Sequence, residues 1–151
     1  MTMDAAEART VIVGIKAGRN PRTALRLAAS EARYRQAGLL AITAYSTDSA
    51  LGAPGGRPLS VVHSGDEERR HAEAQLRACV TDALGDEAEN VEVLAVPGLG
   101  GRNLVEAARK FSADLIVLSA RRGSMMPGTV SQYVLLRSPC PVLVVPVSMA
   151  G

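Results

Sequence analysis

Four cationic side chains stand where predicted apolar segments of this chain end, and they could bind an anion. Lys16 and Arg19 follow the first apolar run of the sequence. Arg121 and Arg122 follow the fourth. A guanidinium group holds phosphate or carboxylate through paired hydrogen bonds, and an ammonium group attracts either as a point charge. Two interpretations stay open: an anion pocket, or a solvated basic rim, which is the commoner arrangement of surface charges.

A glycine at the start of a predicted helix is a second feature of this kind. The segment Gly128-Thr129-Val130-Ser131 opens a helix that is expected to run to about Arg137. The first backbone N–H groups of a helix have no partner within it and therefore attract anions. The hydroxyl group of Thr129 or Ser131 could satisfy the same N–H groups as a cap. A residual anion site and a simple cap are both consistent with these residues.

The residue types that catalysis or a metal site would need are not grouped in the sequence. His63 and His71 have no metal-ligand neighbours at suitable spacing, and no Gly-x-Ser-x-Gly motif is present. The turn at Gly98-Leu-Gly-Gly-Arg-Asn103 has Asn103 where a dinucleotide-binding turn has its third glycine, so a tight strand-to-helix turn is favoured. No general base or carboxylate pair lies near the loop after the fourth apolar run. We expect no catalytic residue, no metal site and no enzyme, with a weak ATPase as the least supported alternative.

Alternating segments must position these candidate residues. Continuous apolar runs, typical of strands covered on both faces, favour strands at residues 10–16, 39–45, 91–96, 114–119 and 141–147. The segments between them show the apolar spacing of helices. This alternation predicts a single α/β domain over residues 1–151, an open parallel sheet with helices on both faces. Ligands of such sheets bind beyond the carboxyl ends of the strands, which here are segments 16–20, 45–47, 97–101 and 119–131.

Local signals predict where helices begin and end. Asn20 is expected to cap the first helix, with Pro21 in its first position. Gly38 and Gly85 are expected to end the first and second helices. Residues 46–63 are rich in Gly and Pro and predict a long loop.

Composition excludes several classes of partner. The formal net charge is only +2 over 151 residues, which does not favour a nucleic acid or a membrane surface as partner. No apolar run approaches the length of a transmembrane helix. The first nine residues are polar and acidic, unlike an export signal. These features predict a cytoplasmic protein.

The segment from Ser112 to Pro146 is similar to the C-terminal signature of the universal stress protein family. The similar stretches are the strand ADLIVL, the helix start GTVSQ and the strand entry SPCPVLVVP. The likeness extends to the first strand, to the helix after Asn20-Pro21 and to Gly98–Ala108. It implies the adenine nucleotide alpha hydrolase-like fold with strand order 3-2-1-4-5. It also implies a stress-response role, with ATP or AMP as the possible ligand.

The chain departs from the family's nucleotide-binding pattern at two places. Family members that bind ATP resemble Gly-x2-Gly-x9-Gly-[Ser/Thr] after the fourth strand. Here Gly128-Thr129 matches the end of that pattern, whereas Ser119 and Arg122 occupy the first two glycine positions and the loop is four residues shorter. Lys16 stands where the family's nucleotide binders carry an acidic residue that contacts the nucleoside. A charged Lys cannot accept the hydrogen bond that the acidic residue would accept from the nucleoside. The altered loop and Lys16 both argue against ATP binding.

These observations predict a non-enzymatic binding or scaffold module whose degenerate nucleotide site holds a small anion. The alternative is an ATP- or AMP-binding module with slow or no hydrolysis. The candidate binding residues lie around the crevice between the first and fourth strands: Ile15, Lys16, Ser119, Arg121, Arg122, Gly123, Gly128, Thr129, Val130 and Ser131.

The last strand predicts an assembly. It is apolar and is expected at the edge of the sheet, where unpaired backbone groups invite pairing with another chain. The family resemblance implies the same assembly, because many family members look like dimers that are joined through this strand. We expect a homodimer, with Val142, Val144 and Val145 at the contact, or else an edge shielded by the loop at residues 46–63.

Overall fold

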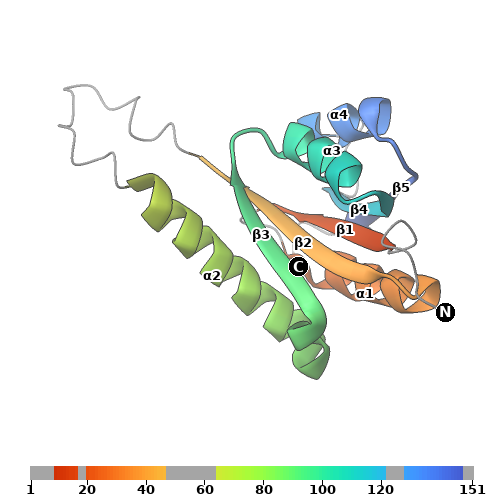
Figure 1. Ribbon diagram of the computed structural model, residues 1–151, viewed down its shortest axis with the longest axis horizontal. Coiled ribbons are helices and arrows are strands. Elements are labelled where there is room, and N and C mark those ends of the chain that lie inside the picture. The colour runs from red at the N-terminus through yellow and green to blue at the C-terminus, as the bar shows by residue number, and fades with distance from the viewer. Residues whose placement is uncertain (1–8, 17–19, 47–63, 122–127, 148–151) are drawn as a thin grey trace.

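The computed structural model of the chain describes residues 9–16, 20–46, 64–121 and 128–147. Five strands alternate with helices along the chain (Figure 1). The strands are β1 (Thr10–Ile15), β2 (Gly38–Tyr45), β3 (Val91–Pro97), β4 (Ala113–Arg121) and β5 (Val142–Val147). The helices are α1 (Arg22–Arg35), α2 (Ser64–Leu84), the 3-10 helix η4 (Gly85–Asn90), α3 (Gly100–Lys110) and α4 (Thr129–Arg137).

The strands form one parallel sheet in the order β3-β2-β1-β4-β5, as predicted. Ile12 of β1 stands opposite Leu40 of β2 on one side and Ile116 of β4 on the other. The chain winds outward from β1 to β3 and then returns to place β4 beside β1. The connections that follow β1 and β4 therefore leave in opposite directions, and this reversal creates a crevice at the carboxyl ends of the two strands.

Each face of the sheet carries its own apolar core. Helices α1 and α2 cover one face, and α3 and α4 cover the other (Figure 1). In β1, Val11 and Val13 belong to the first core and Ile12 to the second, and all three are fully buried. Burial on both faces explains why the strands have continuous apolar runs rather than alternating polar residues.

Two glycines let α3 approach its neighbours closely. A Cβ atom at Gly14 would lie 2.8 Å from the Leu104 Cδ1 atom of α3. A Cβ atom at Gly101, in the first turn of α3, would lie 3.0 Å from the Cβ atom of Tyr133 in α4. A larger residue at Gly14 would have to displace the ends of the Leu104 and Leu118 side chains, whereas one at Gly101 would press on an atom attached to the backbone of α4. Gly101 therefore sets the spacing of the two helices.

At the start of α1 the Asn20 side chain caps the helix as predicted, whereas the end of the helix differs from the expectation. The helix begins at Arg22, one residue after Pro21, and the Asn20 side-chain oxygen accepts a hydrogen bond from the Arg22 N–H group at 3.0 Å. It ends at Arg35, because Gln36 takes the left-handed conformation with φ 54°. Gly38 is instead the first residue of β2.

The end of α2 follows the prediction, and the segment after it does not. Gly85 has φ 60° and follows the last residue of α2, as a C-terminal glycine should. Residues Gly85–Asn90 then form η4, which was not expected. The predicted loop at residues 46–63 lies, apart from Ser46, outside the described residues.

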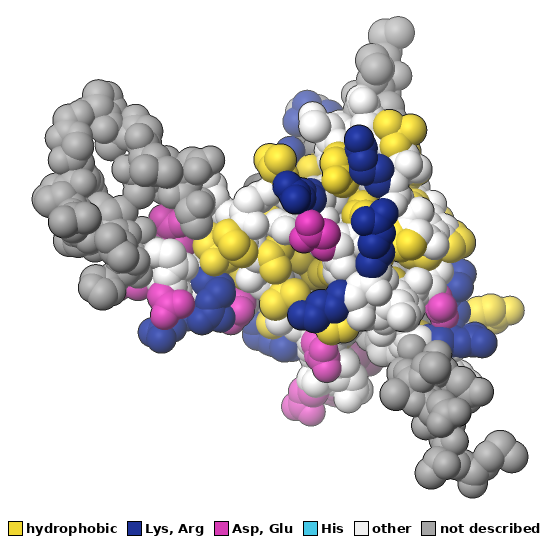
Figure 2. Space-filling model, turned by 45° about the horizontal axis from the view of Figure 1, so that its top comes forward, with side chains coloured by type: hydrophobic (Ala, Val, Ile, Leu, Met, Phe, Trp, Pro, Cys, Tyr) yellow, Lys and Arg dark blue, Asp and Glu magenta, His cyan; other side chains and the backbone are white. Residues whose placement is uncertain are grey.

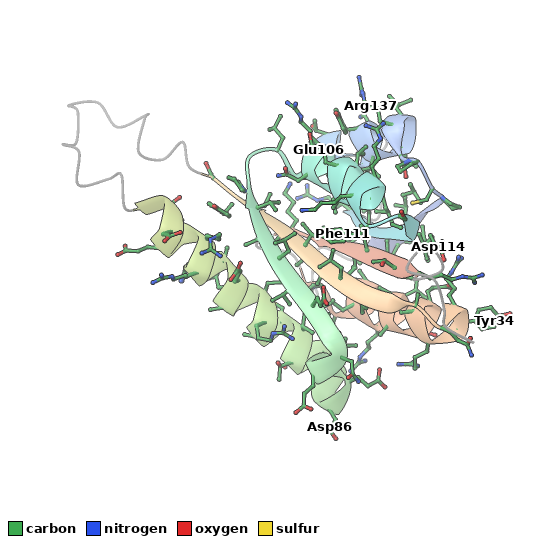
Figure 3. The ribbon with its side chains drawn as sticks, viewed as in Figure 1. Tyr34, Asp86, Glu106, Phe111, Asp114 and Arg137 are labelled. Carbon is green, nitrogen blue, oxygen red and sulfur yellow. The ribbon has the colours of Figure 1, made fainter. Side chains whose placement is uncertain are left out.

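The surface carries a few exposed apolar side chains and no membrane-spanning element among the described helices. Tyr34 projects from α1 (Figure 3) and is 89% exposed. Leu136 of α4 is 80% exposed. In the surface view, hydrophobic side chains lie among Lys and Arg side chains (Figure 2). None of the helices in the described part is long and apolar enough to cross a bilayer.

Candidate functional site

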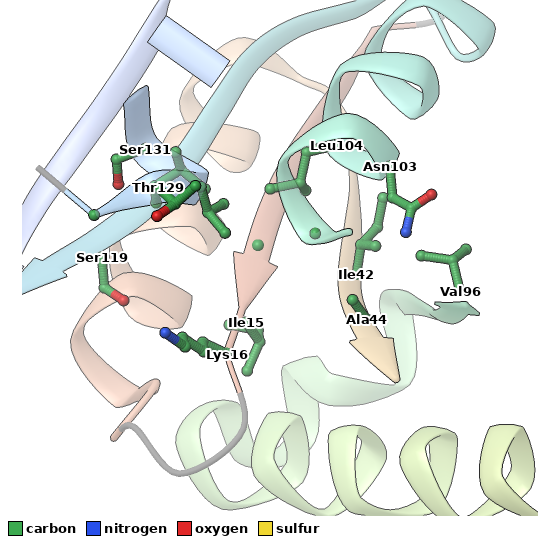
Figure 4. Close-up of a pocket in the computed structure, with 15 residues that line it drawn as sticks. Ile15, Lys16, Ile42, Ala44, Val96, Asn103, Leu104, Ser119, Thr129 and Ser131 are labelled. Atoms are coloured by element: carbon green, nitrogen blue, oxygen red, sulfur yellow. The ribbon is translucent and has the colours of Figure 1, made fainter. Parts of the chain in front are cut away.

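A cavity of about 360 Å³ lies at the carboxyl ends of β1 and β4, between the first turns of α3 and α4 (Figure 4). Residues from the sheet form its floor, and the two helix starts form its sides. Its lining residues are Gly14, Ile15, Lys16, Ile42, Ala44, Val96, Gly100, Asn103, Leu104, Leu118, Ser119, Gly128, Thr129, Val130 and Ser131.

One wall of the cavity is apolar. Ile42 and Ala44 of β2 line it together with Val96 of β3 and Leu104 of α3. Ile42 and Leu104 are 2% and 3% exposed, so packing against the second core holds them in place. A fixed apolar wall of this kind suits a flat, weakly polar group such as a nucleobase.

The opposite side is formed by the start of α4, which has hydrogen-bond donors available. The first bond of the helix runs from the Gln132 N–H group to the Gly128 carbonyl at 2.9 Å, so the N–H groups of residues 129–131 have no acceptor within the helix. Gly128 is the N-cap residue, and no side chain caps the helix. These N–H groups and the helix dipole together favour an anion at this end of the cavity.

Ser131 adds a hydroxyl group to the same end. The residue is only 6% exposed, and its side chain lines the cavity. Its hydroxyl forms no hydrogen bond with any residue in the described part of the chain. Its Oγ atom is not among the buried unpaired polar atoms of the described residues, so it is open to the cavity and can donate to a bound ligand.

Lys16 supplies the charge of the cavity. It follows the last residue of β1, and its side chain extends toward Ser119 and the side where Thr129 lies (Figure 4). None of the ion pairs formed between described residues includes Lys16. Its ammonium group is therefore available to a ligand anion at the start of α4.

The start of α3 offers both donors and an acceptor. No side chain caps this helix at its N-cap residue Leu99. Asn103 donates a hydrogen bond from its Nδ2 atom to the Pro97 carbonyl at 3.0 Å. This bond fixes the amide group and leaves the Oδ1 atom as an acceptor beside the apolar wall. The turn before it contains Gly98 with φ 100°, a conformation that glycine adopts readily.

The structure brings most of the candidate residues to this cavity. Seven of the ten line it: Ile15, Lys16, Ser119, Gly128, Thr129, Val130 and Ser131. Ile15 lies at the rim, with its side chain packed against the first core. Whether these residues bind a ligand stays a prediction.

The other three candidates have different outcomes. Arg121 is exposed at the end of β4, opposite Val147 of β5, and it is not among the residues that line the cavity. Arg121 lies two residues beyond Ser119, which places it roughly 6.6 Å further along the strand than the Ser119 position that lines the cavity. Arg122 and Gly123, like Arg19, lie outside the described residues.

The apolar wall was missed by the sequence reasoning. Ile42, Ala44, Val96 and Leu104 were assigned to strands and a helix but not to the site. The alternation of side chains along a strand could have identified part of this wall. Ile42 and Ala44 lie two and four residues after Leu40, so all three side chains are on the face of the sheet that carries the second core. Using that signal requires knowing which face carries α3 and α4.

The residues of the predicted dimer edge differ in their exposure. Strand β5 is at the end of the strand order and pairs only with β4 among the described strands. Val142 and Val144 are half-buried. Val145 is 7% exposed and packs in the first core, so its side chain does not face outward from the edge.

The described residues contain no group of three or more His, Cys, Asp or Glu side chains that could hold a metal ion. In that part of the chain, no acidic or imidazole side chain lines the cavity. The polar side chains in the described lining are hydroxyl groups, the Asn103 amide and the Lys16 ammonium group. Such a set can bind an anion but offers no carboxylate or imidazole base for proton transfer.

Comparisons with known proteins agree with this architecture. The universal stress protein UspA from Lactobacillus plantarum has 26% sequence identity and a TM-score of 0.70, over 91% of this chain and 97% of that one. A universal stress protein in complex with cAMP has 25% identity and a TM-score of 0.63, over 92% and 97%. A universal stress protein from Archaeoglobus fulgidus in complex with dAMP shares the fold, at 19% identity and a TM-score of 0.54, over 91% and 97%.

The comparison with curated protein sequences found no significant match. The comparison with protein families matches residues 7–146 to the universal stress protein family. That match covers β1 to β5 apart from the last residue of β5, and therefore the whole described lining of the cavity. This chain belongs to the universal stress protein family.

Proposed function

We propose that this chain is a non-enzymatic binding module of the stress response, and that its cavity binds an adenine nucleoside monophosphate through the phosphate group. The observation that carries the proposal is the pairing of an apolar wall with an anion-binding end in one cavity. The wall at Ile42 and Val96 would contact the base. The start of α4 and the Lys16 ammonium group would hold the phosphate.

The size and chemistry of the cavity support a small ligand. A volume of about 360 Å³ is at the lower end of small-molecule sites. The similar protein in complex with cAMP indicates that a member of the family with this overall fold can hold one phosphate and one adenine base. The absence of acidic and imidazole groups from the described lining supports binding without catalysis.

Calorimetry with three ligands tests this function. We expect AMP to bind with a Kd of about 10–100 µM, whereas adenosine and inorganic phosphate each bind at least about tenfold more weakly. The reason is that each of those ligands uses only one side of the cavity. Equal binding of AMP and phosphate would support a bare anion site instead. No binding of AMP at 1 mM, a concentration that corresponds to about −4 kcal/mol, would overturn the proposal.

We also propose that two copies of the chain associate through β5. The support is the unpaired outer edge of β5 in the described part, together with half-buried Val142 and Val144. Leu135 of α4 is 48% exposed and Leu136 is 80% exposed, so apolar surface is available on the helix that packs against this strand. Pairing of the edges of two copies would satisfy the backbone groups and bury the valines.

A further inference from the structure

The charges around the cavity all have one sign. Lys16 is the only ionised side chain among the described lining residues, and none of the others is Asp, Glu or His. The two helices that begin at the cavity, α3 and α4, both present positive dipole ends there. A ligand in this cavity therefore meets positive potential from three directions and no negative side chain in the described lining.

The charge on Lys16 is not neutralised by the protein's described residues. In α2, Asp66 and Glu73 pair with arginines of the same helix, and in α3, Glu106 pairs with Arg102. Asp82 and Glu87 pair with arginines of α1. Lys16 takes part in none of these pairs, so no acidic side chain of the described residues competes with a ligand for its ammonium group.

This arrangement disfavours a metal ion beside the phosphate group. Mg²⁺ in nucleotide sites is held by oxygen ligands, usually a carboxylate or hydroxyl group of the protein together with the phosphates and water. Here the described lining offers hydroxyl groups but no carboxylate. A divalent cation bound to the ligand would also stand close to the Lys16 ammonium group and would neutralise the charge that attracts the ligand.

We propose that Lys16 makes the cavity selective for a phosphomonoester that is free of divalent metal, against nucleotides that carry Mg²⁺ on a di- or triphosphate. The inference rests on the proposed function, because it assigns the ligand class of the same cavity. In this arrangement the Lys16 ammonium group takes the place beside the phosphate that a metal ion would otherwise occupy. Lys16 is then the residue that determines specificity.

The test is calorimetry on the full chain with AMP and ATP, each in EDTA and in excess Mg²⁺. We expect AMP to bind with the same Kd in both buffers, and Mg²⁺ to weaken the binding of ATP by about tenfold or more. Tighter binding of ATP in Mg²⁺ than in EDTA would overturn the inference, because the metal would then be part of the recognised ligand.

Two substitutions and a control separate this inference from the proposed function. Lys16→Met keeps the aliphatic stem and removes the charge, so the Kd for AMP should rise about 10- to 100-fold while adenosine binding stays unchanged. Lys110→Met removes an exposed ammonium group that lies over the Phe111 ring, away from the cavity. This control should leave the Kd values for AMP and for adenosine unchanged. Lys16→Asp should abolish AMP binding in EDTA. Thermal unfolding of each variant shows that it is folded, and Lys16 is exposed enough to be replaced without loss of the core.

The outcomes are distinguishable. If the wild type binds AMP and Lys16→Met binds it equally well, the specificity role of Lys16 is wrong and the proposed function stands. If the wild type binds no AMP in either buffer, both are wrong. An equal loss of AMP binding in the Lys110→Met variant would point to a general effect of net charge and would also overturn the role of Lys16.

Discussion

Gly101 of α3 faces Tyr133 of α4 so closely that a Cβ atom at position 101 would lie 3.0 Å from the Tyr133 Cβ atom. The Cβ atom of Tyr133 is fixed to the backbone of α4 and cannot rotate away. The contact therefore sets the distance between the first turn of α3 and the second turn of α4, two helices that line the same cavity. It connects a packing constraint in the second core to the geometry of the proposed phosphate site.

Gly101→Ala should displace α4 and weaken ligand binding. Alanine is about 1 kcal/mol better than glycine within a helix, but overpacking costs about 1–3 kcal/mol. Because Tyr133 can yield only if α4 moves, we expect a net loss of about 1 kcal/mol and weaker AMP binding. Chemical denaturation and calorimetry measure the two effects.

Gly65→Ala is the matched control for that substitution. Gly65 is also in a helix, α2, and a Cβ atom there would meet nothing within 4 Å. This variant should gain up to about 1 kcal/mol and bind AMP like the wild type. If Gly101→Ala behaved in the same way, the contact with Tyr133 would not set the geometry of the cavity.

Ser131→Ala should separate stability from binding. The Ser131 hydroxyl has no hydrogen-bond partner in the described part of the chain, so its removal should change stability by less than about 0.5 kcal/mol. It should nevertheless raise the Kd for AMP about 5- to 10-fold, because one donor to the phosphate is lost.

Ser138→Ala should show the reverse behaviour. Its hydroxyl donates to the Cys140 carbonyl at 2.7 Å and accepts from the Cys140 N–H group at 3.2 Å, just beyond the C-terminal end of α4. Losing these bonds should cost about 1 kcal/mol of stability and leave AMP binding unchanged.

Equal Kd values of Ser131→Ala and the wild type for AMP would contradict the prediction for Ser131 and would remove that residue from the proposed site.

Val144→Lys should convert the proposed dimer to monomers. Val144 is half-buried on the edge strand, and a Lys there would bring a charge without a partner into the contact. Tyr34→Lys, on an 89% exposed position of α1, is the control that should stay dimeric. Light scattering at tens of micromolar measures both. A monomeric wild type would contradict the proposal, and a dimeric Val144→Lys would place the contact elsewhere.

Apolar runs and turn residues were sufficient to predict the alternating elements, because continuous Val, Ile and Leu segments have few alternatives to buried parallel strands. The strand order came from the resemblance to a family, since the alternation by itself allows several orders. The end of α1 was misplaced because Gln36 adopts the left-handed conformation that glycine normally favours, and the pattern pointed to Gly38. Helix η4 was missed because its sequence GDEAEN has no helical periodicity.

The polar side of the cavity was predictable and its apolar wall was not. Lys16, Ser119 and Thr129 follow from the rule that ligands bind beyond the strand ends, since each lies where a strand ends or a helix begins. Ile42 and Val96 are ordinary strand residues in the sequence. Their role depends on register and on the face that α3 covers, which only the three-dimensional packing determines.

The most direct test of the proposed function is a titration of the ¹⁵N-labelled protein with AMP, followed through its backbone amide resonances. The amides of Thr129, Val130 and Ser131 should shift most and saturate with the calorimetric Kd, because their N–H groups contact the phosphate. The amides of Gly65 and Gly85, remote from the cavity lining, should not move. Binding of AMP that leaves the amides of α4 unmoved, or shifts only residues elsewhere, would contradict the account.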